Sequence, residues 1–151
     1  MSWSDFYRRR DALDAVLRAA AGNPAAPLAF DRDLFATEDD LLLALHYRWM
    51  QQLTGRLGTA LEDDDDRVEI VARTWRELAA EQPVLRAVLD AHLTSTEAVE
   101  REQRLLALTA GLAELSEPGA EIARVGAAFA NLIRTRPGVV AGRHRRLAKS
   151  A

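Results

Sequence analysis

The feature that most constrains the fold is the segment Phe35–Leu61, where apolar residues recur at three- and four-residue steps: Leu42, Leu45, Trp49, Leu53, Leu57 and Ala60. Because an α-helix places such residues on one face, the segment predicts a long amphipathic helix. Four further apolar residues widen this stripe: Leu41, Tyr47, Met50 and Leu61. Thr37 and Asp40 have capping-box spacing, so we expect the helix to begin beside them and to pack on more than one side.

The same period appears in five other segments, at about residues 4–21, 68–81, 83–93, 97–116 and 120–135. No segment of any length has the two-residue period of a strand, and no internal repeat is visible. The sequence of 151 residues has the size of one domain. We therefore predict an all-α, single-domain bundle of about six helices, four of them long, over residues 1–140, followed by a basic C-terminal tail over 141–151.

Three details of this bundle follow from local signals. The apolar stripe of the first helix is expected to be Phe6, Leu13, Val16, Leu17 and Ala20. The connector 22–36 contains two prolines but is apolar, so we expect it to pack against the bundle, with a helical turn at 31–35. The last turns of the fifth helix, with Leu112 and Leu115, are expected in the core.

Composition excludes several classes of protein. With no cysteine, the chain has no disulfide and no thiolate zinc ligand. No apolar run approaches the roughly 18 residues of a membrane span, and no signal peptide is visible, which predicts a soluble cytoplasmic protein without a membrane partner.

Charge is distributed unevenly along the chain. The net charge is −3, yet six basic residues between 134 and 149 carry +6, so residues 1–133 carry −9. The basic tail is a candidate anion contact, through nucleic acid or an acidic partner, with four candidate residues: Arg143, Arg145, Arg146 and Lys149. The alternative is a disordered, solubilising end.

No pattern of catalytic or metal-binding residues is apparent. The chain lacks G-x-S-x-G, a P-loop and a dinucleotide-binding turn, and its hydroxyl groups cluster at helix starts, where capping explains them. No acidic residue lies three positions before a histidine, as a carboxylate-bridged metal site in a bundle would require. We therefore predict a protein that is not an enzyme and has no metal or cofactor.

Two histidines leave a choice open. His46 and His92 both lie on apolar stripes, where a polar ring needs a partner. Each is either a half-buried histidine hydrogen-bonded to a neighbour or part of a pocket for an apolar small molecule. The candidate residues for that pocket are His46, Trp49, Trp75 and His92.

The last helix carries small residues on one side, around Gly126 and Ala130. Such a side usually allows another helix to approach closely, either from the same chain or from a second copy. Its candidate residues in a homodimer interface are Ile122, Gly126, Phe129, Ala130 and Ile133.

The stretch Leu34–Leu45, LFATEDDLLLAL, resembles the junction in TetR-type transcriptional regulators where the DNA-recognition helix ends and a capped, leucine-rich helix begins. Residues 74–93, TWRELAAEQPVLRAVLDAHL, are similar to a helix-break-helix in the regulatory domains of that family. The resemblance implies a helical, dimer-forming, ligand-responsive body whose last two helices could form a four-helix interface. The fifteen residues 22–36 leave no room for the family's helix-turn-helix, and no ligand-binding residue carries over.

The sequence thus predicts a non-enzymatic, homodimeric helical module with a regulatory or protein-interaction role. Two alternatives remain at this point: a small-molecule-binding module with a pocket beside the central helix, and a nucleic-acid-associated protein that uses its basic tail.

Overall fold

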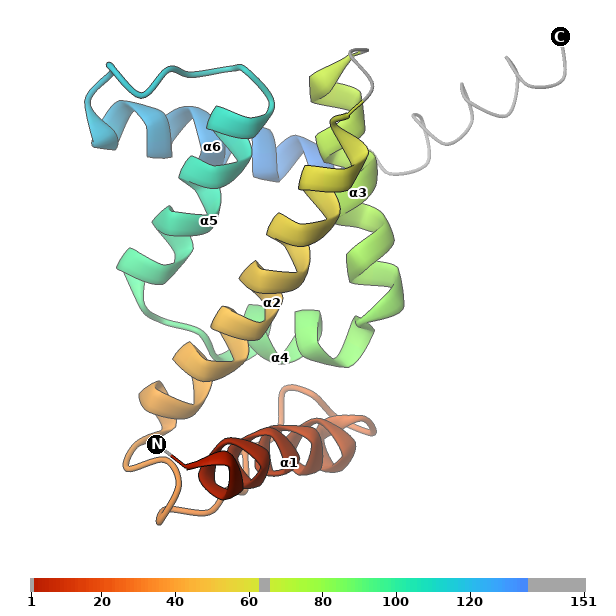
Figure 1. Ribbon diagram of the computed structural model, residues 1–151, viewed down its shortest axis with the longest axis vertical. Coiled ribbons are helices and arrows are strands. Elements are labelled where there is room, and N and C mark those ends of the chain that lie inside the picture. Colours follow the sequence, from red (N-terminus) through yellow and green to blue (C-terminus); the bar gives the residue numbers. More distant parts are fainter. Residues whose placement is uncertain (1, 63–65, 136–151) are drawn as a thin grey trace, which may run out of the picture. The chain divides into compact units, whose positions relative to one another are not determined.

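The computed structural model describes residues 2–62 and 66–135, and these residues form six α-helices and no strand (Figure 1). The helices are α1 (Trp3–Ala20), α2 (Glu38–Ala60), α3 (Arg67–Glu81), α4 (Pro83–His92), α5 (Thr96–Thr109) and α6 (Gly119–Thr135). The predicted all-α class and the number of helices are confirmed. Within these residues, no helix is both long and apolar enough to span a membrane.

Packing divides the chain into two compact units, each discontinuous in sequence. Unit 1 contains Met1–Gln52 and Glu81–Val99, and unit 2 contains Leu53–Ala80 and Glu100–Ala151. Helices α2 and α5 each contribute one part to unit 1 and the other part to unit 2. The boundary predicted at residue 140 lies outside the described residues and stays a prediction.

The starts of α1 and α2 follow the capping signals in the sequence. Ser2 accepts a hydrogen bond from the backbone N–H of Asp5, whose carboxylate in turn accepts from the N–H of Ser2, which makes a complete capping box. At α2 the N–H of Asp40 donates to the hydroxyl of Thr37 over 3.1 Å. The predicted Thr37 cap is therefore confirmed, because its side chain satisfies a backbone donor that the first turn leaves unpaired.

The end of α5 differs from the prediction. The helix stops at Thr109, not near Ser116, because Gly111 adopts a left-handed φ of 73°. The N–H of Leu112 then donates to the carbonyl of Ala107 over 2.9 Å, and that of Gly111 to Leu108 over 3.1 Å, which is the Schellman pattern.

The prediction that Leu112 and Leu115 belong to the core is consequently wrong, because both follow this turn and point into solvent. Leu112 is 43% exposed and Leu115 is 84% exposed. The guanidinium group of Arg67 closes the end of α5 by donating to the carbonyl of Thr109 over 3.0 Å. A side chain from α3 thus satisfies one of the carbonyl groups that every helix leaves free at its C-terminus.

The connector between α1 and α2 contains no helix. The carbonyl of Asp31 accepts from the N–H groups of Leu34 and Phe35, at 3.1 and 3.0 Å, which is the single helical turn expected there. Phe35 is buried, and Leu34 is partly buried, so the connector packs as predicted. No helix-turn-helix forms in residues 22–36.

Unit 2 is built around a close approach of α5 and α6. Gly126 is buried on α6, and a Cβ atom added there would lie 2.9 Å from the Cα of Gln103 and overlap its carbonyl group. The small side chains of α6 therefore admit α5 of the same chain. The guanidinium of Arg76 on α3 donates to the carbonyl of Ile133 over 3.0 Å, and burial lowers the pKa of this arginine from its usual value.

Candidate functional site

The histidines and tryptophans of the predicted pocket fall into both units. His46, Trp49 and His92 belong to unit 1, whereas Trp75 belongs to unit 2. His46 and Trp49 are buried, at 2% and 0% exposure, and the guanidinium of Arg86 lies 4.6 Å from the centre of the Trp49 ring. None of the four lines the hollow described below, and the apolar ligand pocket stays a prediction.

Two of these side chains have polar partners within their own unit. The Nε2 atom of His92 lies 2.8 Å from the carbonyl oxygen of Pro24, so the first of the two interpretations, a half-buried histidine hydrogen-bonded to a neighbour, holds for His92. The indole N–H of Trp75 donates to the carboxylate of Glu102 over 3.0 Å. Both contacts fix the packing of a helix.

The residues predicted for the homodimer interface are mostly enclosed within one chain. Ile122, Phe129 and Ile133 are 4%, 5% and 1% exposed, Gly126 is buried against α5, and Ala130 is partly buried. The homodimer itself stays a prediction, but most of the atoms on this face already have contacts. The anion contact predicted at Arg143, Arg145, Arg146 and Lys149 lies outside the described residues.

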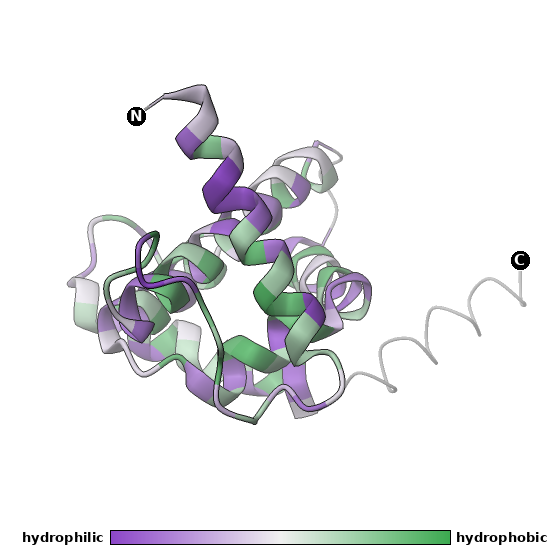
Figure 2. Ribbon diagram, turned by 90° about the horizontal axis from the view of Figure 1, so that it is seen from below, coloured by the Kyte–Doolittle hydropathy of each residue, from purple (hydrophilic) through white to green (hydrophobic). Residues whose placement is uncertain are grey.

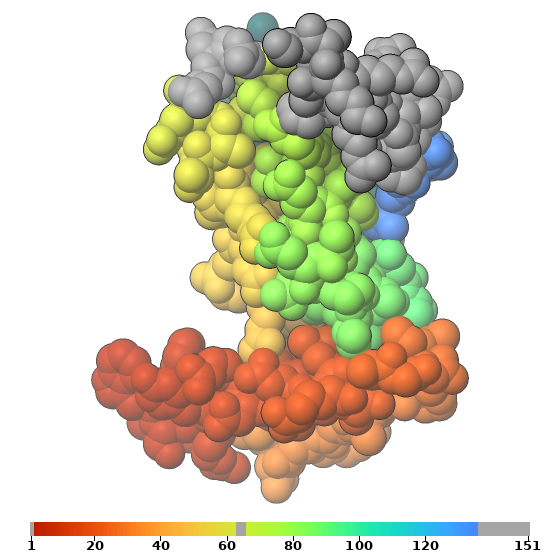
Figure 3. All heavy atoms as spheres, turned by 90° about the vertical axis from the view of Figure 1, so that its right-hand side faces the viewer, coloured from red at the N-terminus to blue at the C-terminus, as the bar shows by residue number. Residues whose placement is uncertain are grey.

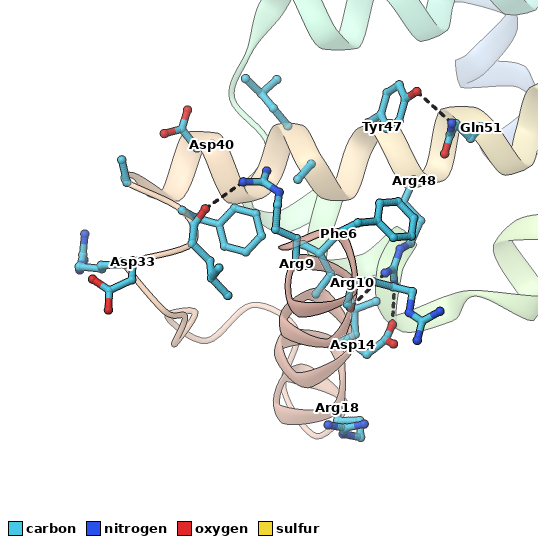
Figure 4. Close-up of a pocket in the computed structure, with 18 of the residues that line it drawn as sticks. Phe6, Arg9, Arg10, Asp14, Arg18, Asp33, Asp40, Tyr47, Arg48 and Gln51 are labelled. Atoms are coloured by element: carbon cyan, nitrogen blue, oxygen red, sulfur yellow. Dashed lines mark hydrogen bonds and ion pairs between the residues drawn. The ribbon is translucent and has the colours of Figure 1, made fainter. Parts of the chain in front are cut away.

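Unit 1 contains a hollow of about 1260 Å³ between α1, the connector and the first half of α2 (Figure 4). The largest apolar side chains that line it from the two helices are Phe6, Leu13, Leu17, Leu43 and Tyr47. Five arginines and three aspartates also line it: Arg9, Arg10, Arg18, Arg32 and Arg48, with Asp14, Asp33 and Asp40. The hollow thus carries a surplus of positive charge in a chain whose net charge is −3.

Two of the arginines in the hollow hold its walls together. The guanidinium of Arg9 donates to the carbonyl of Leu34 over 3.0 Å and lies 4.8 Å from the centre of the Phe35 ring. Arg48 on α2 makes a 2.7 Å ion pair with Asp14 on α1 (Figure 4). These contacts tie α1 to the connector and to α2, so they give both guanidinium groups a structural role.

The other three arginines of the hollow are exposed. Arg10 lies over the ring of Tyr7 at 4.8 Å and makes a weak 3.5 Å ion pair with Asp11. Arg18 occupies the last turn of α1, and Arg32 lies 5.0 Å from a phenylalanine ring of the connector. Their guanidinium groups are therefore placed to meet an anionic group from outside.

An exposed group of three aromatic side chains continues the hollow at the start of α1. We call Trp3, Phe6 and Tyr7 the aromatic edge. They are 76%, 52% and 44% exposed, and their ring centres lie 5.5 to 6.3 Å apart. The predicted inclusion of Phe6 in the buried stripe of the first helix is therefore wrong.

The aromatic edge lies where α1 has few neighbours from its own unit. In Figure 3 the N-terminal end of α1, in dark red, stands clear of the other segments of unit 1. Figure 2 shows a hydrophilic first half of α1 and a more hydrophobic second half, and the buried residues Leu13, Val16 and Ala20 all belong to the second half. The spacing of residues 3, 6 and 7, which share one helical face, is the signal in the sequence that could have revealed this group.

Other chemistry is not apparent in the described residues. Residues 2–62 and 66–135 contain no group of three or more histidine, aspartate or glutamate side chains that could hold a metal ion. No protein-family model, curated protein or solved structure matches the chain. The resemblance to TetR-type regulators therefore stays a prediction.

Proposed function

We propose that the protein is a non-enzymatic helical interaction module that binds other protein chains through one face of unit 1. This docking face consists of the aromatic edge and the hollow beside it. The observation that carries the proposal is the exposure of three aromatic side chains, Trp3, Phe6 and Tyr7, that touch one another and leave much of their surface in water.

The residue types on this face are those that dominate protein interfaces. Aromatic side chains bury a large area at a small cost in conformational entropy, and tryptophan, tyrosine and arginine are enriched at the sites that carry most binding energy. Leu43 and Tyr47 of α2, which are 41% and 64% exposed, extend the apolar surface into the hollow. Single exposed apolar residues are common, but contiguous ones mark interaction surfaces.

A second copy of the chain is one partner in this proposal, in line with the homodimer that the sequence predicts. The face of α6 that the sequence favours for the dimer is mostly enclosed, since Phe129 and Ile133 are at most 5% exposed. We therefore place the contact between copies on the aromatic edge, which leaves the hollow of the docking face to other partners. A twofold dimer needs the same patch from both chains, and an aromatic edge of this kind can pack against its symmetry mate.

The experiment is a measurement of molar mass by light scattering across the micromolar range for three forms of the chain. They are the wild type, the double variant Trp3→Ser/Phe6→Ser and the control Leu115→Ser, which removes an 84% exposed leucine from unit 2. We expect the wild type and the control to form dimers and the double variant to be a monomer.

Two outcomes would count against this proposal in different ways. If the double variant dimerises as well as the wild type, the aromatic edge is not part of the interface. If the wild type stays monomeric across the micromolar range, a second copy is not a partner, and the proposal is limited to the binding of other proteins.

A further inference from the structure

The side chains that line the hollow of unit 1 indicate which class of partner it binds. Two helices line it over similar lengths, from Phe6 to Arg18 on α1 and from Asp40 to Gln52 on α2, each about 18 Å along the helix axis. On α1 the lining residues Phe6, Arg10 and Arg18 belong to one row at four-residue steps. Asp14 occupies the remaining place in this row, so this wall presents one apolar and three charged side chains, two of them exposed arginines.

We propose that this hollow binds an acidic, amphipathic helix of a partner protein. The inference rests on the proposed interaction function and names the partner's chemistry. The apolar stripe of such a helix would meet Phe6, Leu43 and Tyr47, and its carboxylates would meet the exposed guanidinium groups of Arg10, Arg18 and Arg32.

Charge complementarity indicates the sign of the charge that the partner carries. Arginines outnumber aspartates five to three in the hollow, although acidic residues outnumber basic ones in the whole chain. The 2.7 Å ion pair of Asp14 with Arg48 neutralises one aspartate and one arginine of the hollow, and four arginines then face two aspartates. A basic helix would meet exposed arginines of its own sign, whereas an acidic helix would meet opposite charges and be steered toward them.

The size of the hollow favours a helix over a small molecule. Pockets that enclose a drug-sized ligand have volumes of about 300–1,000 Å³ and bury most of the ligand's surface. This hollow is larger, at about 1260 Å³, and its lining residues Phe6 and Tyr47 are 52% and 64% exposed. An amphipathic helix docks by laying its apolar face into such an open groove.

The test uses two synthetic helical peptides with the same leucine and phenylalanine stripe, one with glutamates and the other with lysines on its remaining positions. Binding to the full chain is measured by the fluorescence anisotropy of a labelled peptide. We expect the acidic peptide to bind more tightly than the basic one by at least about tenfold, as two or three rim ion pairs would provide. Its affinity should fall with added salt, because exposed charges are screened.

Matched variants connect this selectivity to the hollow. Arg10→Gln/Arg18→Gln removes two charges from it, whereas Arg73→Gln/Arg124→Gln removes two exposed arginines from unit 2. We expect the first variant to lose about tenfold in affinity for the acidic peptide and the second to bind it nearly as the wild type does. Circular dichroism of both variants checks that their helices are intact.

Three outcomes would overturn the inference, and they differ in what they say about the proposed function. If both peptides bind equally and the variant Trp3→Ser/Phe6→Ser binds neither, the docking face is supported but the preference for an acidic partner is refuted. If neither peptide binds but the chain still dimerises through the aromatic edge, the acidic partner is likewise refuted and the docking face is still supported. A shift of tryptophan emission on vesicles of phosphatidylserine and phosphatidylcholine that is lost in Trp3→Ser/Phe6→Ser, without any binding of the acidic peptide, would assign the face to anionic lipid.

Discussion

Gly126 offers the sharpest test of the packing in unit 2. In the substitution Gly126→Ala the new Cβ atom would lie 2.9 Å from the Cα of Gln103 and closer still to its carbonyl group. Carbon atoms in contact normally lie about 3.5–4.0 Å apart, so α5 and α6 would have to separate by roughly 1 Å. Both opposing atoms belong to the backbone, and no side chain can rotate away to relieve the overlap.

The expected loss of stability follows from two opposing contributions. Overpacking of a tight contact costs about 1–3 kcal/mol, and more where backbone has to move. Alanine recovers up to about 1 kcal/mol relative to glycine inside a helix. We therefore expect Gly126→Ala to lower the free energy of unfolding by about 2 kcal/mol, which in a chain of this length lowers Tm by roughly 4–8 °C.

Two other glycines supply the control, because they also lie inside a helix. Gly55 and Gly58 of α2 are exposed, and a Cβ atom at either would meet nothing within 4 Å. The substitutions Gly55→Ala and Gly58→Ala should each raise the free energy of unfolding by about 0.5–1 kcal/mol. Urea unfolding followed by circular dichroism would measure all three variants. A Gly126→Ala variant as stable as the wild type would refute the close approach of α5 to α6.

Three further substitutions test individual contacts by the same measurement. Gly111→Ala should lower the free energy of unfolding by about 1–2 kcal/mol, because a residue with a side chain resists the left-handed φ of 73°; an unchanged stability would contradict the assigned end of α5. Glu102→Ala removes the acceptor of a buried indole N–H and should cost about 1–3 kcal/mol, with a shifted Trp75 emission, whereas Glu102→Gln retains an acceptor and should cost less. Asp14→Asn should cost no more than about 1 kcal/mol, because its partner Arg48 is partly exposed to solvent; a much larger loss would mean that this ion pair holds unit 1 together.

The helices could be predicted because their signals are local. Apolar residues at three- and four-residue steps and caps such as Thr37 identified all six, and the start of α2 was placed to within one residue. The end of α5 was missed because the apolar spacing continues through Leu108, Leu112 and Leu115. A single glycine at 111 outweighs that spacing, since its left-handed conformation reverses the chain.

The hollow could not be predicted in the same way, because its walls come from segments far apart in the sequence. Arg9 and Leu34 meet across 25 positions, and Arg48 and Asp14 across 34 positions. Helical periodicity assigned Phe6 to a buried stripe, but it gives no information on where a helix extends past its neighbours. Exposure at the end of α1 is a property of packing, so it becomes visible only in the structure.

The consecutive residues Arg8, Arg9 and Arg10 have the same charge but different roles in the structure. In the sequence these residues are three equal charges in a row. Successive helical residues point about 100° apart, so each meets a different environment. Arg8 faces Asp5 across 4.0 Å in solvent, Arg9 ties the connector through the carbonyl of Leu34, and Arg10 lines the hollow beside Tyr7. Their replacement should therefore have three distinct effects: none on stability at Arg8, a loss of stability at Arg9, and a loss of acidic-peptide binding at Arg10.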